Sequence, residues 1–158
     1  MTPELGDMYW YYLIADTAPC LPQPQQTVPF QISQRLAFPY LVGLIHMAVP
    51  IPLHWLFQMG AILAVLGSLL LVASILTSQS LHPRQVVVVL AIVAFNPWTV
   101  RPYLTDPATT RLTFMLGLAL VLRGLFAART GMVLLGQLVA SLSRQTGLLL
   151  LPLIAVWL

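Results

Sequence analysis

The sequence predicts an all-α protein, a polytopic bundle of helices in a membrane. Hydrophobic residues make up 59% of the 158-residue chain and charged residues only 7%, with a mean hydropathy of +0.89. Soluble domains carry about 25% charged residues, so this chain lacks the polar side chains that cover a globule in water. The segment 53–77 contains no Asp, Glu, Lys or Arg, and it is long enough to cross a bilayer with some tilt.

The charged residues exclude one class of partner. The chain has seven arginines, no lysine and four acidic residues, and its formal charge is +3. These charges are scattered between apolar segments, whereas nucleic-acid-binding proteins gather basic residues on one face. We therefore expect no nucleic-acid partner. Membrane lipid is the expected partner, because the loops of membrane proteins carry basic residues at the interface.

Residues 1–52 are expected to form an external loop with two interfacial helices. In the first, Asp7, Tyr11, Ile14 and Ala15 fall at i, i+4, i+7 and i+8, which is one face of a helix. The carboxylate of Asp7 at this position has two possible roles. It caps the helix, as Asp commonly does, or it serves chemistry where the membrane meets water.

The second interfacial helix is expected at Leu36–Ile45, before Pro50 and Pro52. This apolar run has about half of the roughly 20 residues that a transmembrane helix needs. It therefore predicts an interfacial or partly inserted helix.

Residues 53–158 are expected to form the transmembrane region. Its two last segments are each too short to span, and they flank Ser143–Gly147. They form either two half-length helices that meet at a break or one long helix with a buried arginine, and Gly147 favours the break. The chain stops inside an apolar run, which predicts that it is part of a longer protein. The expected helices are 53–77, 85–100, 112–128, 131–143 and 146–158.

Two acidic residues are expected on the same side of the membrane. Asp7 precedes the segment 53–77, and Asp106 follows the segment 85–100. If both segments cross, one span down and one span back return the chain to its starting side. We therefore expect the two carboxylates to approach one pocket, bounded by the Leu36–Ile45 helix.

These motifs resemble the GT-C superfamily of membrane glycosyltransferases, which use polyprenyl-phosphate-linked sugars. The Asp7 helix is similar to the D-x-x-x-Y-x-x-I-A pattern in the first external loop of that family. Relative to the family, the chain looks like an N-terminal fragment that lacks the first transmembrane helix. Three later stretches follow the family order: Gln34–Leu41 like the second juxtamembrane helix, Asn96–Pro107 like the second external loop, and Ser143–Pro152 like the break between two short helices.

The resemblance implies a role for each candidate residue. Asp7 would be the catalytic base, and Asp7 and Asp106 would contact a divalent cation, Mg²⁺ or Mn²⁺, since both cations prefer oxygen ligands. For Asp106, a turn-forming Asp before proline is an equal alternative. Arginines would hold the lipid phosphate by bidentate pairing, although plain interfacial arginines are the simpler interpretation. The implied substrate-binding residues are Tyr11, Arg35, Arg101, Arg111 and Arg144.

The function implied is transfer of a sugar from a polyprenyl-phosphate donor to an acceptor at the external membrane face. The implied location is the bacterial inner (plasma) membrane, in a multi-pass protein of the cell envelope. The alternative is a non-enzymatic small membrane subunit, a scaffold or a transporter component. A transporter would favour polar residues within its helices. Here the acids lie in expected loops, which favours chemistry at the membrane face.

Overall fold

The computed structural model describes residues 6–22, 28–33, 35–97, 99, 107–108 and 110–157. Every regular element among these residues is a helix, so the predicted all-α class is confirmed. In chain order the elements are α1 (Gly6–Thr17), α2 (Phe30–Ser33), α3 (Ala37–Ala48), α4 (Leu53–Ser78), α5 (Pro83–Ala94), α7 (Arg111–Phe126), α8 (Thr130–Ser143), the 3₁₀ helix η2 (Gln145–Leu150) and α9 (Leu151–Trp157).

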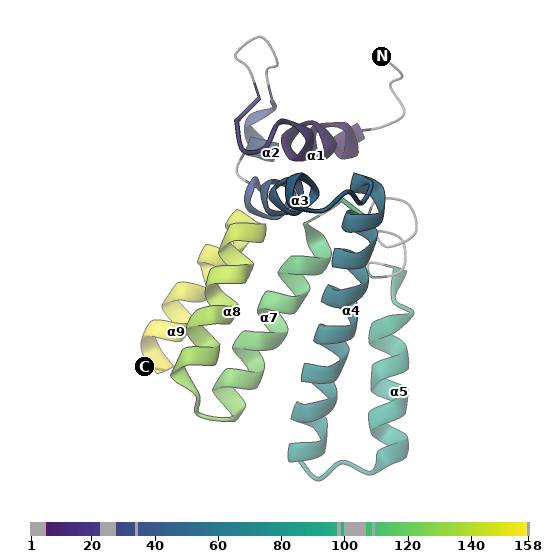
Figure 1. Ribbon diagram of the computed structural model, residues 1–158. Coiled ribbons are helices and arrows are strands. Elements are labelled where there is room, and N and C mark those ends of the chain that lie inside the picture. Colours follow the sequence, from purple (N-terminus) through teal and green to yellow (C-terminus); the bar gives the residue numbers. More distant parts are fainter. Residues whose placement is uncertain are drawn as a thin grey trace.

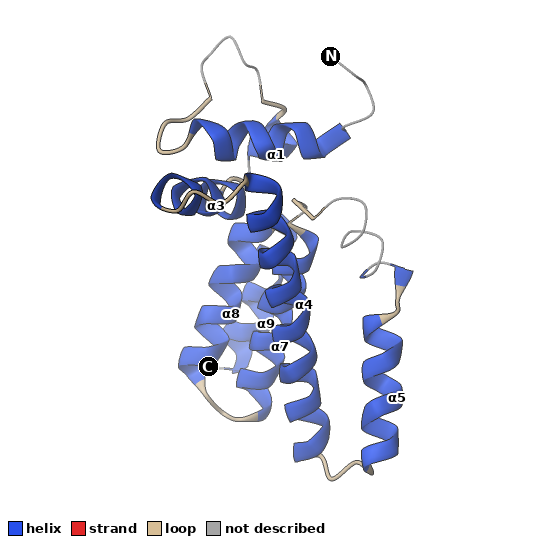
Figure 2. Ribbon diagram, turned by 45° about the vertical axis from the view of Figure 1, so that its right-hand side comes forward, coloured by secondary structure: helices blue, strands red, loops and turns tan. Residues whose placement is uncertain are grey.

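The helices form two layers (Figure 1). The long helices α4, α5, α7 and α8 stand side by side as a bundle, and α9 lies against α8. The helices α1, α2 and α3 lie across one end of this bundle and cover it, as a second view also shows (Figure 2). We call this the covered end.

Helix α4 is the one described helix that is long and apolar enough to cross a membrane. Its 26 residues extend over about 39 Å, which exceeds the ~30 Å hydrocarbon core of a bilayer. Only 17% of its most apolar window is buried within the protein, and Leu63, Leu66 and Leu70 are exposed. The core helix of a soluble fold would be mostly buried, so this exposure favours contact with lipid.

Helix α5 covers Pro83–Ala94 rather than the expected 85–100. A proline lies at or near each end and sets where the helix begins and stops. At the start, His82 Nδ1 accepts a hydrogen bond from the Arg84 amide at 3.3 Å, and Gln85 Oε1 accepts one from the His82 amide at 3.1 Å. Pro83 occupies the first helical turn, where its missing N–H costs nothing. At the other end, Pro97 disfavours helical geometry for the residue before it, and the helix stops at Ala94.

Helices α7 and α8 form a tight antiparallel hairpin. A Cβ on Gly136 would lie 2.5 Å from the Val121 amide nitrogen and 2.7 Å from the Gly117 carbonyl oxygen. The two backbones therefore approach as closely as small residues allow, which is a common way of packing helices in membranes.

The chain breaks after α8. Arg144 is extended, with φ −155° and ψ 141°, and η2 and α9 follow it. The prediction of two short helices meeting at a break is therefore confirmed, and a single long helix with a buried arginine is excluded. A Cβ on Gly147 would lie 2.5 Å from the Ala140 carbonyl carbon, so only glycine lets η2 pack this closely on α8.

Aromatic packing fixes the covering layer to the bundle. Phe57, near the start of α4, has no exposed surface. Its ring centroid lies 4.8 Å from that of Tyr12 in α1 and 5.8 Å from that of Phe38 in α3. In addition, a Cβ on Gly43 of α3 would collide with the Ala15 carbonyl of α1. Close backbone contact therefore joins α1 and α3 to each other, and the aromatic side chains join them to the bundle.

Candidate functional site

Tyr11 lies at the centre of the contact between α1 and the covered end. It is 1% exposed, and Ile14 and Ala15 on the same face of α1 are equally buried. These residues form one apolar cluster with Val42, Phe57 and others from α3 and α4. The face predicted from their spacing therefore turns inward, toward the covered end of the bundle.

Arg35 reaches the hydroxyl of Tyr11. It lies two residues after the end of α2, and its Nη1 donates a hydrogen bond to Tyr11 Oη at 3.4 Å. This length is at the long end for a hydrogen bond, so the guanidinium keeps most of its capacity for another acceptor. Two predicted substrate-binding residues, 24 positions apart in sequence, are thus in contact.

Arg144 lies close to the same group of residues. It is half-buried in the break between α8 and η2, outside the long helices. Burial lowers the pKa of Arg144, and the positive charges of Arg35 and Arg111 lower it further. Arg35 and Arg111 are thus two cations whose charge acts on Arg144. Arg111 opens α7 and is exposed.

We call Tyr11, Arg35, Arg111 and Arg144 the arginine cluster. It joins four segments of the chain: α1, the connection between α2 and α3, the start of α7 and the break after α8. Among the side chains that the structure describes, no carboxylate pairs with its arginines. Asp16 is the only described acid, and it is exposed at the far end of α1. Among the described side chains, these three arginines are cations without a paired carboxylate, an arrangement suited to phosphate.

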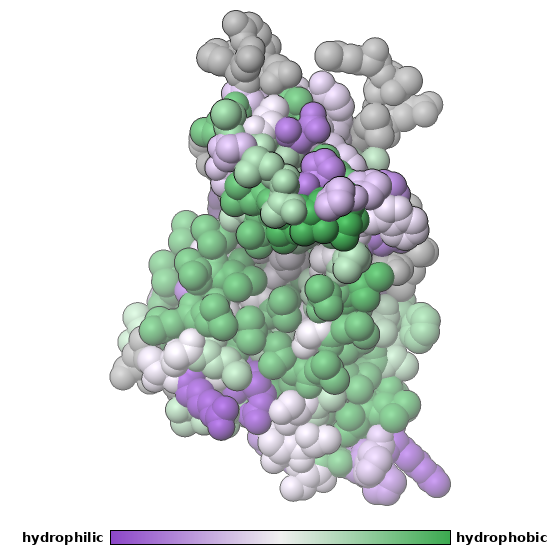
Figure 3. Space-filling view, viewed as in Figure 1, coloured by the Kyte–Doolittle hydropathy of each residue, from purple (hydrophilic) through white to green (hydrophobic). Residues whose placement is uncertain are grey.

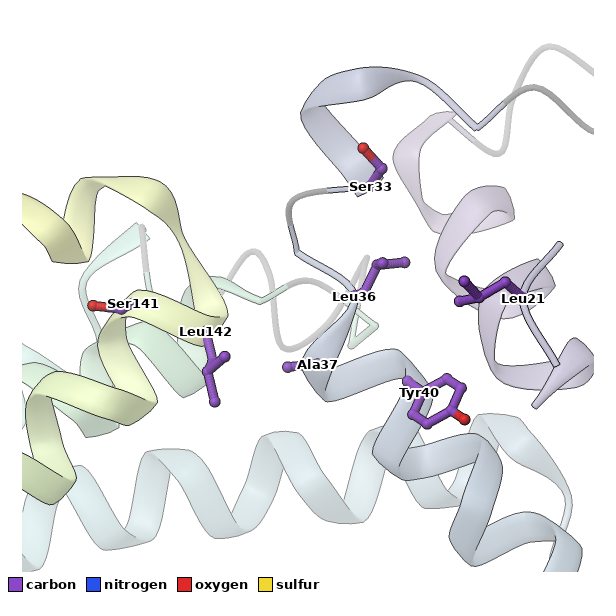
Figure 4. A pocket seen from close by; sticks show the side chains of 7 residues that line it. All are labelled: Leu21, Ser33, Leu36, Ala37, Tyr40, Ser141 and Leu142. Atoms are coloured by element: carbon purple, nitrogen blue, oxygen red, sulfur yellow. The ribbon is translucent and has the colours of Figure 1, made fainter. Parts of the chain in front are cut away.

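An apolar pocket lies beside the cluster, between α3 and the end of α8 (Figure 4). Its volume is about 360 Å³, at the small end of the range for ligand sites. Arg35 lies between two lining residues in sequence, and Arg144 follows two others, so the pocket opens next to positive charge. Its lining residues are Leu21, Ser33, Leu36, Ala37, Tyr40, Ser141 and Leu142.

Sequence reasoning missed most of this pocket. Leu36 and Ala37 belong to the expected interfacial helix, but Ser141 and Leu142 were interpreted only as part of a short apolar segment. Tyr40 Oη donates a hydrogen bond to the Pro19 carbonyl at 2.7 Å, which joins α3 to the loop that carries Leu21. No local sequence pattern predicts the pocket as a whole, because it joins residues more than 100 positions apart.

Three predicted site residues lie wholly or partly outside the described residues. Arg101 and Asp106 are not described. For Asp7 the structure describes the backbone, which lies in the first turn of α1, one turn before Tyr11. Ala108, two residues after Asp106, is fully buried in the same apolar cluster as Tyr11.

The described residues do not form a metal site. Within the described part of the chain, no three His, Cys, Asp or Glu side chains gather. The described part of the arginine cluster offers cations and a phenol, and these are poor ligands for Mg²⁺ or Mn²⁺. The predicted ligands, Asp7 and Asp106, lie outside the described side chains, so the divalent cation stays a prediction.

Comparison with protein-family models, curated proteins and solved structures finds no match to this chain. The resemblance to GT-C glycosyltransferases therefore stays a prediction from sequence motifs.

Proposed function

We propose that this chain acts in a membrane glycosyltransferase of the GT-C type, which transfers a sugar from a polyprenyl-phosphate donor to an acceptor at the external membrane face. One observation carries the proposal: Tyr11, Arg35, Arg111 and Arg144 converge at the covered end of the bundle. The resemblance to GT-C enzymes implied a substrate-binding role for each of these residues. Their convergence in three dimensions supports that role.

We propose a multi-pass position in the membrane as part of this function. Beside α4, the helices α5 and α8 also expose large apolar side chains, among them Val87, Val88, Leu134 and Leu138. The face of the bundle that Figure 3 shows is apolar over most of its length, and hydrophilic residues lie at its lower end. Helices α5, α7 and α8 are shorter than a full span, so we propose that they cross a bilayer thinned by the protein.

The pocket and the arginine cluster together fit an amphiphile with an anionic head. The phosphate would lie on Arg35, Arg111 and Arg144, because guanidinium groups pair bidentately with phosphate oxygens. The first part of the hydrocarbon chain would occupy the pocket beside Leu36 and Leu142. This arrangement would hold the donor at the membrane face with its sugar directed toward α1.

Asp7 is the proposed general base. Its position in the first turn of α1 is at the covered end, one helical turn from Tyr11. Its carboxylate would accept the proton of the acceptor hydroxyl, while the acceptor oxygen forms a bond to the anomeric carbon of the sugar. The bond between that carbon and the phosphate oxygen breaks, and polyprenyl phosphate leaves with its charge held by the arginines.

Sugar transfer by the protein in its native membrane tests the proposal. Substitution Asp7→Asn should reduce turnover about 10²–10⁴-fold, because the amide keeps the shape of the side chain but cannot accept the proton. Asp16→Asn is the matched control, since Asp16 is an exposed acid on the same helix. Full activity of Asp7→Asn would exclude Asp7 as the base. No transfer by the wild-type protein from any polyprenyl-phosphate sugar would favour a scaffold or transporter subunit.

A further inference from the structure

We infer that Gln137 is a positioning residue, which holds the break after α8 in the geometry that places Arg144 next to the pocket between α3 and the end of α8. The functional importance of that geometry rests on the proposed function. The geometry itself does not, and it can be tested separately.

Gln137 connects α8 to the turn that follows it. Its side chain is 7% exposed. The amide Nε2 donates two hydrogen bonds, one to Ser141 Oγ at 2.8 Å and one to the Gly147 carbonyl at 2.9 Å. The second bond spans the break, with Arg144 between its two ends.

The break needs such a donor because it lies among apolar residues. Where a helix stops, its last carbonyls lose their intrahelical partners, and in apolar surroundings unpaired carbonyls are costly. A side chain from the preceding helix can supply the missing hydrogen bond. Gln137 donates across the break to the carbonyl of Gly147 in η2, and the close contact between Gly147 and Ala140 packs the turn onto α8 at the same point.

The oxygen of the Gln137 side-chain amide indicates that this residue does more than fill space in the core. Gln137 Oε1 is buried and has no hydrogen-bond partner. An unpaired buried acceptor costs free energy, which an apolar side chain of the same length would avoid. The amide is therefore explained by its two donated bonds, which set the position of the turn.

The fixed turn determines the position of Arg144. Its backbone is extended between two segments that are fixed to each other by Gln137 and Gly147. A half-buried arginine near two other cations would move away from them if its backbone were loose. The fixed turn therefore holds Arg144 in the cluster against charge repulsion.

The first test measures the geometry alone. In a Cys20→Ser background, spin labels are placed at Met59→Cys on α4 and Gln145→Cys in the turn, both exposed positions. Gln137→Met keeps the length of the side chain but donates no hydrogen bond. It should shift or broaden the distance distribution between the labels, whereas Leu138→Met, its exposed neighbour, should not. An unchanged distribution in Gln137→Met would overturn the inference.

A milder variant covers the case in which Gln137→Met does not fold. Ser141→Ala removes one of the two acceptors that orient the amide, and the hydroxyl contributes little to packing. It should broaden the same distribution to a smaller extent. A narrow, unshifted distribution in this variant would also count against a positioning role.

The second test uses decaprenyl phosphate as the probe in lipid nanodiscs. Gln137→Met should weaken its binding about tenfold, the scale of one charge-assisted hydrogen bond. Arg144→Gln should weaken binding much less in the Gln137→Met background than in wild type, because the two residues act as one unit. Additive effects would overturn the inference. Failure of the wild-type protein to bind the probe would contradict the proposed function and leave the distance measurement to decide on Gln137.

Discussion

At the scale of single residues, the covered end carries arginines that no described carboxylate pairs with. Arg35, Arg111 and Arg144 lie close enough for two of them to lower the pKa of the third. Burial of Arg144 is the larger cause of that lowered pKa, so the residue is held where water screens its charge less than at the surface. Such an arrangement costs stability in the absence of an anion and gains it when one binds.

Substitution Arg144→Gln should therefore leave the ligand-free protein as stable as wild type, or more stable by up to ~1 kcal/mol after screening by solvent. Thermal unfolding in detergent measures this. Arg129→Gln is the control, because Arg129 is exposed at the opposite end of the bundle and should change stability by less than about 0.5 kcal/mol. A clear loss of stability in Arg144→Gln would mean that the arginine has an anionic partner within the protein.

The same residues show what sequence can predict about a site. The burial of Tyr11 follows from periodicity, because it shares a helical face with Ile14 and Ala15. The resemblance to GT-C enzymes selected Arg35, Arg111 and Arg144 one at a time. Their proximity to each other could not be predicted, since it depends on how helices more than 100 residues apart pack together.

At the scale of elements, small residues determine the packing of the bundle. In the α7–α8 hairpin, Gly136 faces the backbone of α7 at Val121 and Gly117. Backbone atoms cannot move aside as a flexible side chain can. The hairpin therefore depends on the absence of a Cβ at this position.

Substitution Gly136→Ala should destabilise the protein by about 1–3 kcal/mol, the usual cost of overpacking. Gly131→Ala is the matched control on the same helix, because a Cβ there meets nothing within 4 Å. Alanine also favours helix over glycine, so the control should be neutral or slightly stabilising. Thermal unfolding of both variants in the same detergent measures the difference. Equal stability of the two variants would contradict the close packing of α7 on α8.

The boundaries of a helix could be predicted from the sequence where charged or polar residues mark the ends of an uncharged segment. The uncharged segment 53–77 corresponds to α4, which ends one residue later at Ser78. The expected helix 85–100 was wrong at both ends, because hydropathy alone ignores the capping by His82 and the effect of Pro97. The break after Ser143 was left open by the sequence, and its donor, Gln137, lies in the preceding helix where no local motif marks it.

For the whole molecule, the two ends of the bundle differ in chemistry. The covered end carries α1–α3 and the arginine cluster, and Cys20 lies exposed between α1 and α2. At the opposite end are the two short connections α4–α5 and α7–α8; Arg84 lies in the first turn of α5, and Arg129 lies in the α7–α8 connection. The proposed function requires the covered end to face outward.

A membrane-impermeant maleimide should therefore label Cys20 on intact cells. In a Cys20→Ser background, Ser80→Cys in the α4–α5 connection should react only after permeabilisation, because Ser80 is exposed at the opposite end. Labelling of both positions on intact cells would contradict a spanning α4. The reverse pattern would place the covered end inside the cell and exclude an external active site.

The most direct test of the phosphate-binding cluster compares decaprenyl phosphate with neutral decaprenol, both in nanodiscs of uncharged lipid. The cluster predicts that the wild-type protein prefers the phosphate, and that Arg35→Gln and Arg144→Gln each reduce this preference about 10- to 100-fold. Arg129→Gln should leave it unchanged. Equal affinity of the wild-type protein for the two lipids, or a preference that survives both substitutions, would contradict the account.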